Sequence, residues 1–171
     1  MSKESKYASH LPVLKLIYSL RNYYNVLEFG CGNYSTKYFI YNCKNVTSIE
    51  MQNEQWFNKI KTEVNDNTFY MPKKEGVEWL KNTKDIYDLI LVDGINRVDC
   101  INASFGRTDI IVLHDIGLKA IKCKSYQGIQ NNNGYEFLLM NMDYPNTGIF
   151  TKDIELADKL KMNEGYVKVN I

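Results

Sequence analysis

The feature that most constrains this chain is a regular alternation of short apolar segments with longer amphipathic ones. Five segments have the length and composition of buried β-strands and begin about twenty residues apart: 26–29, 46–49, 68–71, 87–92 and 110–114. Connections of this length are long enough for a helical crossover between parallel strands. The spacing therefore predicts an α/β fold with a doubly wound, mostly parallel sheet flanked by helices.

Helical periodicity fills the space around these strands. The predicted helices lie at 11–22, 34–42, 54–64 and around Val77 and Leu80. Asn53 stands where an N-cap is expected for the helix at 54–64, because its side chain can accept a hydrogen bond from a free backbone amide.

The pattern changes after residue 134. Segments 136–142 and 147–151 are predicted strands with only four residues between them, which is too short for a parallel crossover. We therefore expect a C-terminal antiparallel hairpin, followed by a helix capped by Asp153 and an edge strand near 166–171. We interpret residues 1–171 as a single domain with its core at 25–151 and a terminal helix and strand at 153–171.

The charge balance excludes some functions. Lys and Arg number 21, Asp and Glu number 20, and the net charge is +1. This near-neutral balance argues against a protein whose main function is to bind nucleic acid or anionic lipid. No apolar run approaches the roughly 18 residues of a membrane helix, and the first residues lack the apolar core of a signal peptide. We expect a cytoplasmic protein without membrane association.

Cysteine and histidine spacing gives no metal signature. The potential ligands of this kind are Cys31, Cys43, Cys100, Cys123, His10 and His114. The cysteines form no CxxC pair, and no spacing matches a common zinc site. We expect free thiols and no metal.

A glycine turn joins the first predicted strand to the first crossover helix. Gly30 and Gly32 allow the backbone to turn tightly and to approach a ligand at the helix N-terminus. Glu50 ends the second strand, where doubly wound sheets place an acid for ribose hydroxyls. The glycines could instead form only a tight turn and Glu50 a solvated strand end, but the combination favours a ligand that contains ribose.

Two more strands end in acids. Asp93 follows the strand at 87–92, and His114 and Asp115 follow one another at the end of the strand at 110–114. Since the carboxyl ends of parallel strands share one edge, both carboxylates should reach the same crevice. They indicate an acid–base site or a metal pair, or each simply caps the helix that follows.

Four segments together resemble a known family. They are VLEFGCGNYST (26–36), VTSIEMQNEQW (46–56), YDLILVDGINRVDC (87–100) and DIIVLHD (109–115). In order and spacing the chain resembles the class I S-adenosylmethionine-dependent methyltransferases, in the form of their small members without an added substrate domain. The resemblance implies a Rossmann-like fold, S-adenosyl-L-methionine as cofactor, and methyl transfer to an oxygen of a small-molecule or glycan-like acceptor.

The resemblance also implies roles around the methionine part of the cofactor. Gly30 and Gly32 would lie against it, with Glu28 below and Ser35 nearby, although Ser35 stands where the family motif has a third glycine. Asp93 would lie beside the amino-acid end and the reacting methyl group.

A second set of implied roles concerns the adenosine. Glu50 would accept hydrogen bonds from the ribose hydroxyls, and Met51 would pack on the adenine. Gly76 and Val77 would border the adenine edge.

On the acceptor side, the candidates for a base are Asp93, His114 and Asp115. Arg97 could hold an anionic or hydroxyl-rich acceptor through its planar guanidinium, or pair with the nearby Asp99. Cation-dependent members of the family carry an Asp-Asn pair after the fifth strand.

In this chain Ile116 follows Asp115, so a metal-independent reaction is expected. The long segment 116–134 is a candidate lid over the acceptor.

Two other functions fit parts of the pattern. A non-catalytic module could use the same fold to bind the cofactor or a protein partner. A nicotinamide-dependent oxidoreductase would also use a glycine turn, but 171 residues leave no room for its catalytic domain.

Overall fold

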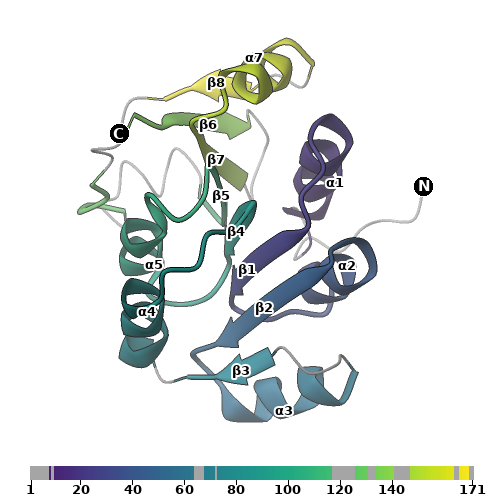
Figure 1. Ribbon diagram of the computed structural model, residues 1–171, viewed down its shortest axis with the longest axis vertical. Helices are drawn as coiled ribbons and strands as arrows, with labels where there is room; N and C mark the ends of the chain where they lie inside the picture. Colours follow the sequence, from purple (N-terminus) through teal and green to yellow (C-terminus); the bar gives the residue numbers. More distant parts are fainter. Residues whose placement is uncertain are drawn as a thin grey trace.

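The computed structural model describes residues 8, 10–63, 68–71, 73–116, 126–130, 134–140, 147–163 and 166–169. Its helices and strands alternate along the chain (Figure 1). In chain order they are α1 (His10–Leu20), β1 (Asn25–Phe29), α2 (Ser35–Asn42), β2 (Asn45–Glu50), α3 (Glu54–Glu63), β3 (Thr68–Tyr70), α4 (Lys73–Asn82), β4 (Leu89–Val92), α5 (Arg97–Ser104), β5 (Ile110–His114), β6 (Glu136–Met140), β7 (Thr147–Thr151), α7 (Ile154–Asn163) and β8 (Tyr166–Lys168). Within these residues, no helix combines the length and the apolar character that a membrane crossing requires.

The described strands form one sheet in the order β3-β2-β1-β4-β5-β7-β6-β8. Strands β1 to β5 pair in parallel, and β7, β6 and β8 add to the β5 edge in antiparallel pairs. This arrangement confirms the predicted doubly wound sheet with a C-terminal hairpin.

The order of the strands creates a switch point at the centre of the sheet. After β1 the chain moves outward through β2 and β3, and then returns to place β4 and β5 on the other side of β1. The connections that leave β1 and β4 therefore diverge, and a crevice forms at the carboxyl ends of these two strands.

Alternate side chains of the buried strands pack into two cores, one on each face of the sheet. Leu27 of β1 belongs to a core that α4 and α5 complete with Leu80 and Ile101. Its neighbour Val26 belongs to the opposite core, which includes Leu14 of α1 and also residues of α2 and α7. Figure 1 shows these helices on the two sides of the sheet.

The C-terminal segments complete the open edge of the sheet. Strands β6 and β7 pair from Glu136↔Thr151 to Leu139↔Gly148, and β8 forms the outer edge, as predicted. The expected turn at 143–146 lies outside the described residues.

Several elements differ from the sequence prediction. Helix α1 begins at His10, one residue before the expected start. Strand β4 begins at Leu89 and not at 87, because Asp88 turns its carboxylate to the backbone amides of Tyr24 and Asn25 at 2.8 and 2.9 Å. The sequence did not locate α5, whose mixed surface has little amphipathic periodicity.

Candidate functional site

The ends of β1 and β4 approach so closely that only glycine fits between them. Gly30 has a φ of +93°, and a Cβ atom on it would lie 2.6 Å from the backbone nitrogen of Gly94. The Gly30 amide donates to the carbonyl of Ile49, and the Asp93 amide donates to that of Phe29, both at 2.8 Å. The two turns are therefore held against each other at the carboxyl edge of the sheet.

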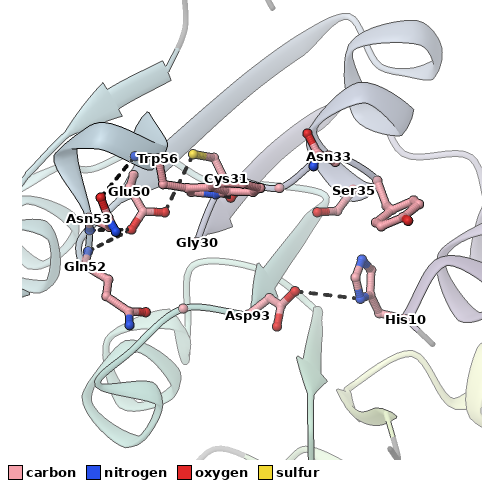
Figure 2. Close-up of a pocket in the computed structure, with 13 residues that line it drawn as sticks. His10, Gly30, Cys31, Asn33, Ser35, Glu50, Gln52, Asn53, Trp56 and Asp93 are labelled. Carbon is pink, nitrogen blue, oxygen red and sulfur yellow. Dashed lines mark hydrogen bonds and ion pairs between the residues drawn. The ribbon is translucent and has the colours of Figure 1, made fainter. Parts of the chain in front are cut away.

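A cleft of about 550 Å³ opens at this edge (Figure 2). Its walls are the loop 30–35, the turn between β2 and α3, and the turn after β4, and His10 of α1 lines it as well. A Cβ atom on Gly32 would meet only the Ser35 Oγ, at 3.5 Å. The glycine loop therefore leaves free space where a ligand would lie.

Glu50 is held in one orientation at the end of β2. Its Oε1 accepts hydrogen bonds from the amides of Gln52 (2.8 Å) and Asn53 (3.1 Å), while Oε2 lies 3.7 Å from the Cys31 Sγ. Burial raises the pKa of the Cys31 thiol, so the thiol stays protonated and donates weakly. Oε2 is thus available to a stronger donor from a ligand.

Helix α3 is tied to the glycine loop. The Trp56 Nε1 donates to the carbonyl of Cys31 at 2.7 Å, and the Asn53 Oδ1 accepts from the Trp56 amide at 3.1 Å. The second contact confirms the predicted N-cap. Both Asn53 and Trp56 line the cleft, a role that the sequence did not assign to them.

Glu28 supports the glycine loop from within the sheet. Its Oε2 accepts hydrogen bonds from the hydroxyls of Thr36 (2.6 Å) and Ser48 (2.7 Å), and the Thr36 hydroxyl also accepts from the Gly32 amide (2.8 Å). Its Oε1 is buried without a hydrogen-bond partner among the described residues. Burial raises the pKa of Glu28 to about 7, against the lowering effect of these hydroxyl donors.

The acids after β4 and β5 belong to one network. The Asp93 Oδ1 lies 2.6 Å from the His114 Nδ1. The Arg97 Nη2 lies 3.6 Å from the same Asp93 oxygen and 3.2 Å from the Asp115 Oδ2. The ion pairs of Arg97 within the described residues are therefore with these site acids and not with Asp99, while a contact with an acceptor stays a prediction.

His10 joins this network from α1. Its Nδ1 lies 3.7 Å from the Asp93 Oδ2, and its ring meets that of His114 edge-on, with centroids 4.4 Å apart. Burial lowers the pKa of His10 to about 4, partly offset by Asp93, so the imidazole is neutral at pH 7. Sequence reasoning missed His10 as a site residue, and the only signal was that the chain has two histidines.

A second cavity of about 570 Å³ adjoins the cleft. It shares Gln52, Asp93 and Gly94 with the cleft and extends along Arg97 to Tyr126. The Tyr126 hydroxyl donates to the Asp115 carbonyl at 3.2 Å. Asp93 therefore lies where the two cavities meet.

The predicted lid over 116–134 falls largely outside the described residues, which include only 126–130 and the ends of this segment. The part at 126–130 lies against α5. The Asn102 Nδ2 donates to the Gly128 carbonyl at 2.7 Å, and its Oδ1 accepts from the Gln130 amide at 2.8 Å.

The residues expected at the adenine are grouped but do not line the cleft. Met51 and Val77 are 4% exposed and share one core. A Cβ atom on Gly76 would lie 2.8 Å from the Met51 Sδ. For these three residues a ligand contact stays a prediction, whereas Gly30, Gly32, Ser35, Glu50 and Asp93 lie on the cleft wall.

Comparison with known proteins identifies the fold. The sequence matches no family model and no curated protein. The structure is similar to the N-methyltransferase NodS from Bradyrhizobium japonicum WM9 in complex with S-adenosyl-L-homocysteine, with a TM-score of 0.58 at 15% identity over 89% of this chain and 90% of that one.

Two further solved structures extend this similarity. The precorrin-6y C5,15-methyltransferase from Geobacter metallireducens GS-15 matches with a TM-score of 0.53 at 16% identity, over 88% of this chain and 91% of that one. The magnesium protoporphyrin IX methyltransferase from Synechocystis PCC 6803, solved with bound S-adenosylmethionine, matches with a TM-score of 0.54 at 12% identity, over 81% and 74%. The chain thus has the fold of the class I methyltransferases, as the sequence resemblance implied.

Replacing Glu28 should remove one source of pH-dependent stability. Because the pKa of Glu28 rises from 4.5 to about 7 on folding, the folded state favours the protonated carboxyl. This contribution is fully present below pH 4.5 and is lost as the pH rises through about 7, a change of about 3 kcal/mol. Urea unfolding between pH 4.5 and about 8 should show the wild type losing that much free energy relative to Glu28→Gln.

The exposed Glu54 provides the control for this experiment. Glu54→Gln should follow the wild type at every pH. If the free energies of unfolding of wild type and Glu28→Gln differ by the same amount at every pH, the raised pKa of Glu28 is contradicted.

Proposed function

We propose that the cleft binds S-adenosyl-L-methionine and that the protein transfers its methyl group to an oxygen of a small-molecule or glycan-like acceptor. The observation that supports this most directly is the pairing of an open glycine loop with an oriented carboxylate. A Cβ atom on Gly32 would meet only the Ser35 Oγ within the described residues, and the Glu50 Oε2 lies on the cleft wall without a strong donor among those residues.

The chain's own groups suit the two ends of such a ligand. Two ribose hydroxyls can donate to the Glu50 Oε2, whose partner oxygen is already fixed by two amides. At the other end, the Ser35 hydroxyl and Asp93 border the cleft beside Gly30. When bound, the sulfonium supplies an activated methyl group, and the protein's main contribution is to position the acceptor in line with it.

The second cavity supports a small acceptor. It meets the cleft at Asp93, and Arg97 offers a guanidinium along its wall. In this arrangement Asp93, held by His114 at 2.6 Å, can accept the proton that an acceptor hydroxyl releases. Arg97 and Asp115, which pair at 3.2 Å, lie on the acceptor side of Asp93, where the guanidinium can bind the acceptor. Nucleic acid is not an expected acceptor, and the cytoplasmic location stays a prediction.

Gly32→Val should abolish cofactor binding and leave the fold intact. The added side chain has room in the protein, because a Cβ atom meets only the Ser35 Oγ at 3.5 Å, but it would occupy the ligand's space. Calorimetry with S-adenosylmethionine should therefore detect no binding, while the melting temperature stays near that of wild type. Wild-type affinity in this variant would remove the glycine loop from the site.

Gly30→Ala is the matched control. It should cost about 1–3 kcal/mol of stability, because its backbone has a left-handed φ and its Cβ would clash with Gly94. The two variants thus separate loss of binding in a stable protein from loss of stability.

Glu50→Gln should weaken cofactor binding about tenfold or more. The amide retains an oxygen for the Gln52 and Asn53 amides but loses charge-assisted bonds to the ribose, worth about 1.5–3 kcal/mol. Glu54→Gln, four positions further on and exposed, should bind like wild type. Equal affinities of both variants in calorimetry would show that Glu50 contacts no ligand.

Activity is tested by methyl transfer to a panel of hydroxyl compounds, including sugars and phenols, with radiolabelled S-adenosylmethionine. We expect labelled product with at least one acceptor, and we expect Asp115→Asn to lower turnover more than cofactor affinity. Binding of S-adenosylmethionine without transfer to any acceptor would favour the non-catalytic module. Binding of NADH in its place would favour the oxidoreductase.

A further inference from the structure

We infer that His10, Asp93 and His114 form a binding site for a divalent transition-metal ion beside the cleft. The inference is independent of the identity of the cofactor. It also departs from the expectation of no metal, which rested on residue spacing and on Ile116 standing where cation-dependent members of the resembling family carry Asn.

The fold brings the chain's two histidines together. They come from distant parts of the sequence: His10 starts α1, and His114 ends β5. Both are buried, at 2% and 4% exposure, and their ring centroids lie 4.4 Å apart. Asp93 lies close to both rings.

The Asp93 carboxylate lies between the two imidazoles. Its Oδ1 faces the His114 Nδ1 at 2.6 Å, and its Oδ2 faces the His10 Nδ1 at 3.7 Å. One ligand atom from each of the three side chains lies within 4.8 Å of the other two. Metal–ligand bonds of about 2.0–2.2 Å place neighbouring ligand atoms roughly 3–4 Å apart, so small side-chain rotations suffice to bring the three atoms onto one ion.

His10 supplies an independent indication of a ligand. Neither of its ring nitrogens has a hydrogen-bond partner among the described residues, although the side chain is buried. An unsatisfied buried polar group costs free energy, and a metal ion would satisfy one of these nitrogens. Figure 2 shows His10 facing Asp93 beside the cleft, which would give an ion access from solvent.

Asp115 and Arg97 form the surroundings of the proposed site. The Asp115 Oδ1 lies 3.6 Å from the His114 Nε2, the nitrogen that faces away from Asp93. A carboxylate behind a ligating histidine orients its ring and raises its basicity. Arg97 lies 3.6 Å from Asp93 and 3.2 Å from Asp115, so Asp115 can retain the guanidinium when Asp93 binds the ion.

The donor set selects the class of metal. Two imidazole nitrogens and one carboxylate oxygen suit Zn²⁺, Co²⁺, Ni²⁺ or Fe²⁺, whereas Mg²⁺ prefers oxygen ligands. Three protein ligands leave coordination positions open. Since Asp93 borders both cavities, those positions would face the acceptor, and this last point rests on the proposed function.

Histidine-selective NMR tests the site directly, because His10 and His114 are the chain's only histidines. In full-length protein labelled with ¹⁵N-histidine, Zn²⁺ should shift the Nδ1 resonances of both rings at one equivalent, and Co²⁺ should broaden both. Mg²⁺ should change neither. This readout is insensitive to metal bound at the free cysteines. Zn²⁺ titration that leaves both histidine spectra unchanged would overturn the inference.

Variants extend the test: calorimetry measures the affinity of each variant for Co²⁺ in the absence of cofactor. His10→Ala and Asp93→Asn should lose the site, and Asp115→Asn should weaken it about 10–100-fold, as expected for a residue that acts through His114. Asp99→Asn removes the same charge from the exposed side of α5 and should bind like wild type. Circular dichroism establishes that each variant is folded, and unchanged binding in a folded His10→Ala would also overturn the inference.

The outcome is distinguishable from that of the proposed function. S-adenosylmethionine binding is measured separately, on metal-free protein and on Gly32→Val. If S-adenosylmethionine does not bind but Zn²⁺ still shifts both histidine resonances, the proposed function fails and the metal site is retained. If S-adenosylmethionine binds but Zn²⁺ shifts neither resonance, only the metal site is contradicted.

Discussion

The contact between Gly30 and Gly94 is the constraint on which the site depends. A single methyl group at Gly30 would lie 2.6 Å from the neighbouring backbone nitrogen, so the two turns can meet only because Gly30 lacks a side chain. Their contact fixes the carboxyl ends of β1 and β4 side by side at the switch point of the sheet. The glycine loop and Asp93, one on each turn, are thereby held on facing walls of one cleft.

Around this contact the fold buries groups that would be more stable in water. Within the described residues, Glu28 lies fully buried below the glycine loop with one oxygen that accepts no hydrogen bond, and His10 is buried with neither ring nitrogen in a hydrogen bond. Burial of this kind opposes ionisation and lowers stability. The two apolar cores on either face of the sheet supply the compensating stability. Polar groups concentrated at one edge of an otherwise apolar sheet are typical of a ligand site.

Much of the fold could be predicted from local pattern. Buried strands such as β4 and β5 are continuous apolar runs, and their spacing implies parallel crossovers. The C-terminal hairpin was predicted because only four residues connect its two strands. The N-cap at Asn53 was predicted because an asparagine side chain can accept a hydrogen bond from a free backbone amide. Helix α5 was not located, because its packing against α4 and its neighbours, and not a periodic apolar face, determines its position.

The sequence by itself determined the residues that each strand delivers to the sheet edge. Gly30, Glu50, Asp93 and Asp115 all follow directly from the ends of predicted strands, since position along a parallel strand fixes position at its edge. Only the tertiary structure decided what these residues meet. It joined Arg97 to Asp115, kept Met51 in the core, and placed His10 against Asp93. The position of His10 depends on how α1 packs across the sheet, and no local pattern in the sequence encodes the packing angle of a helix.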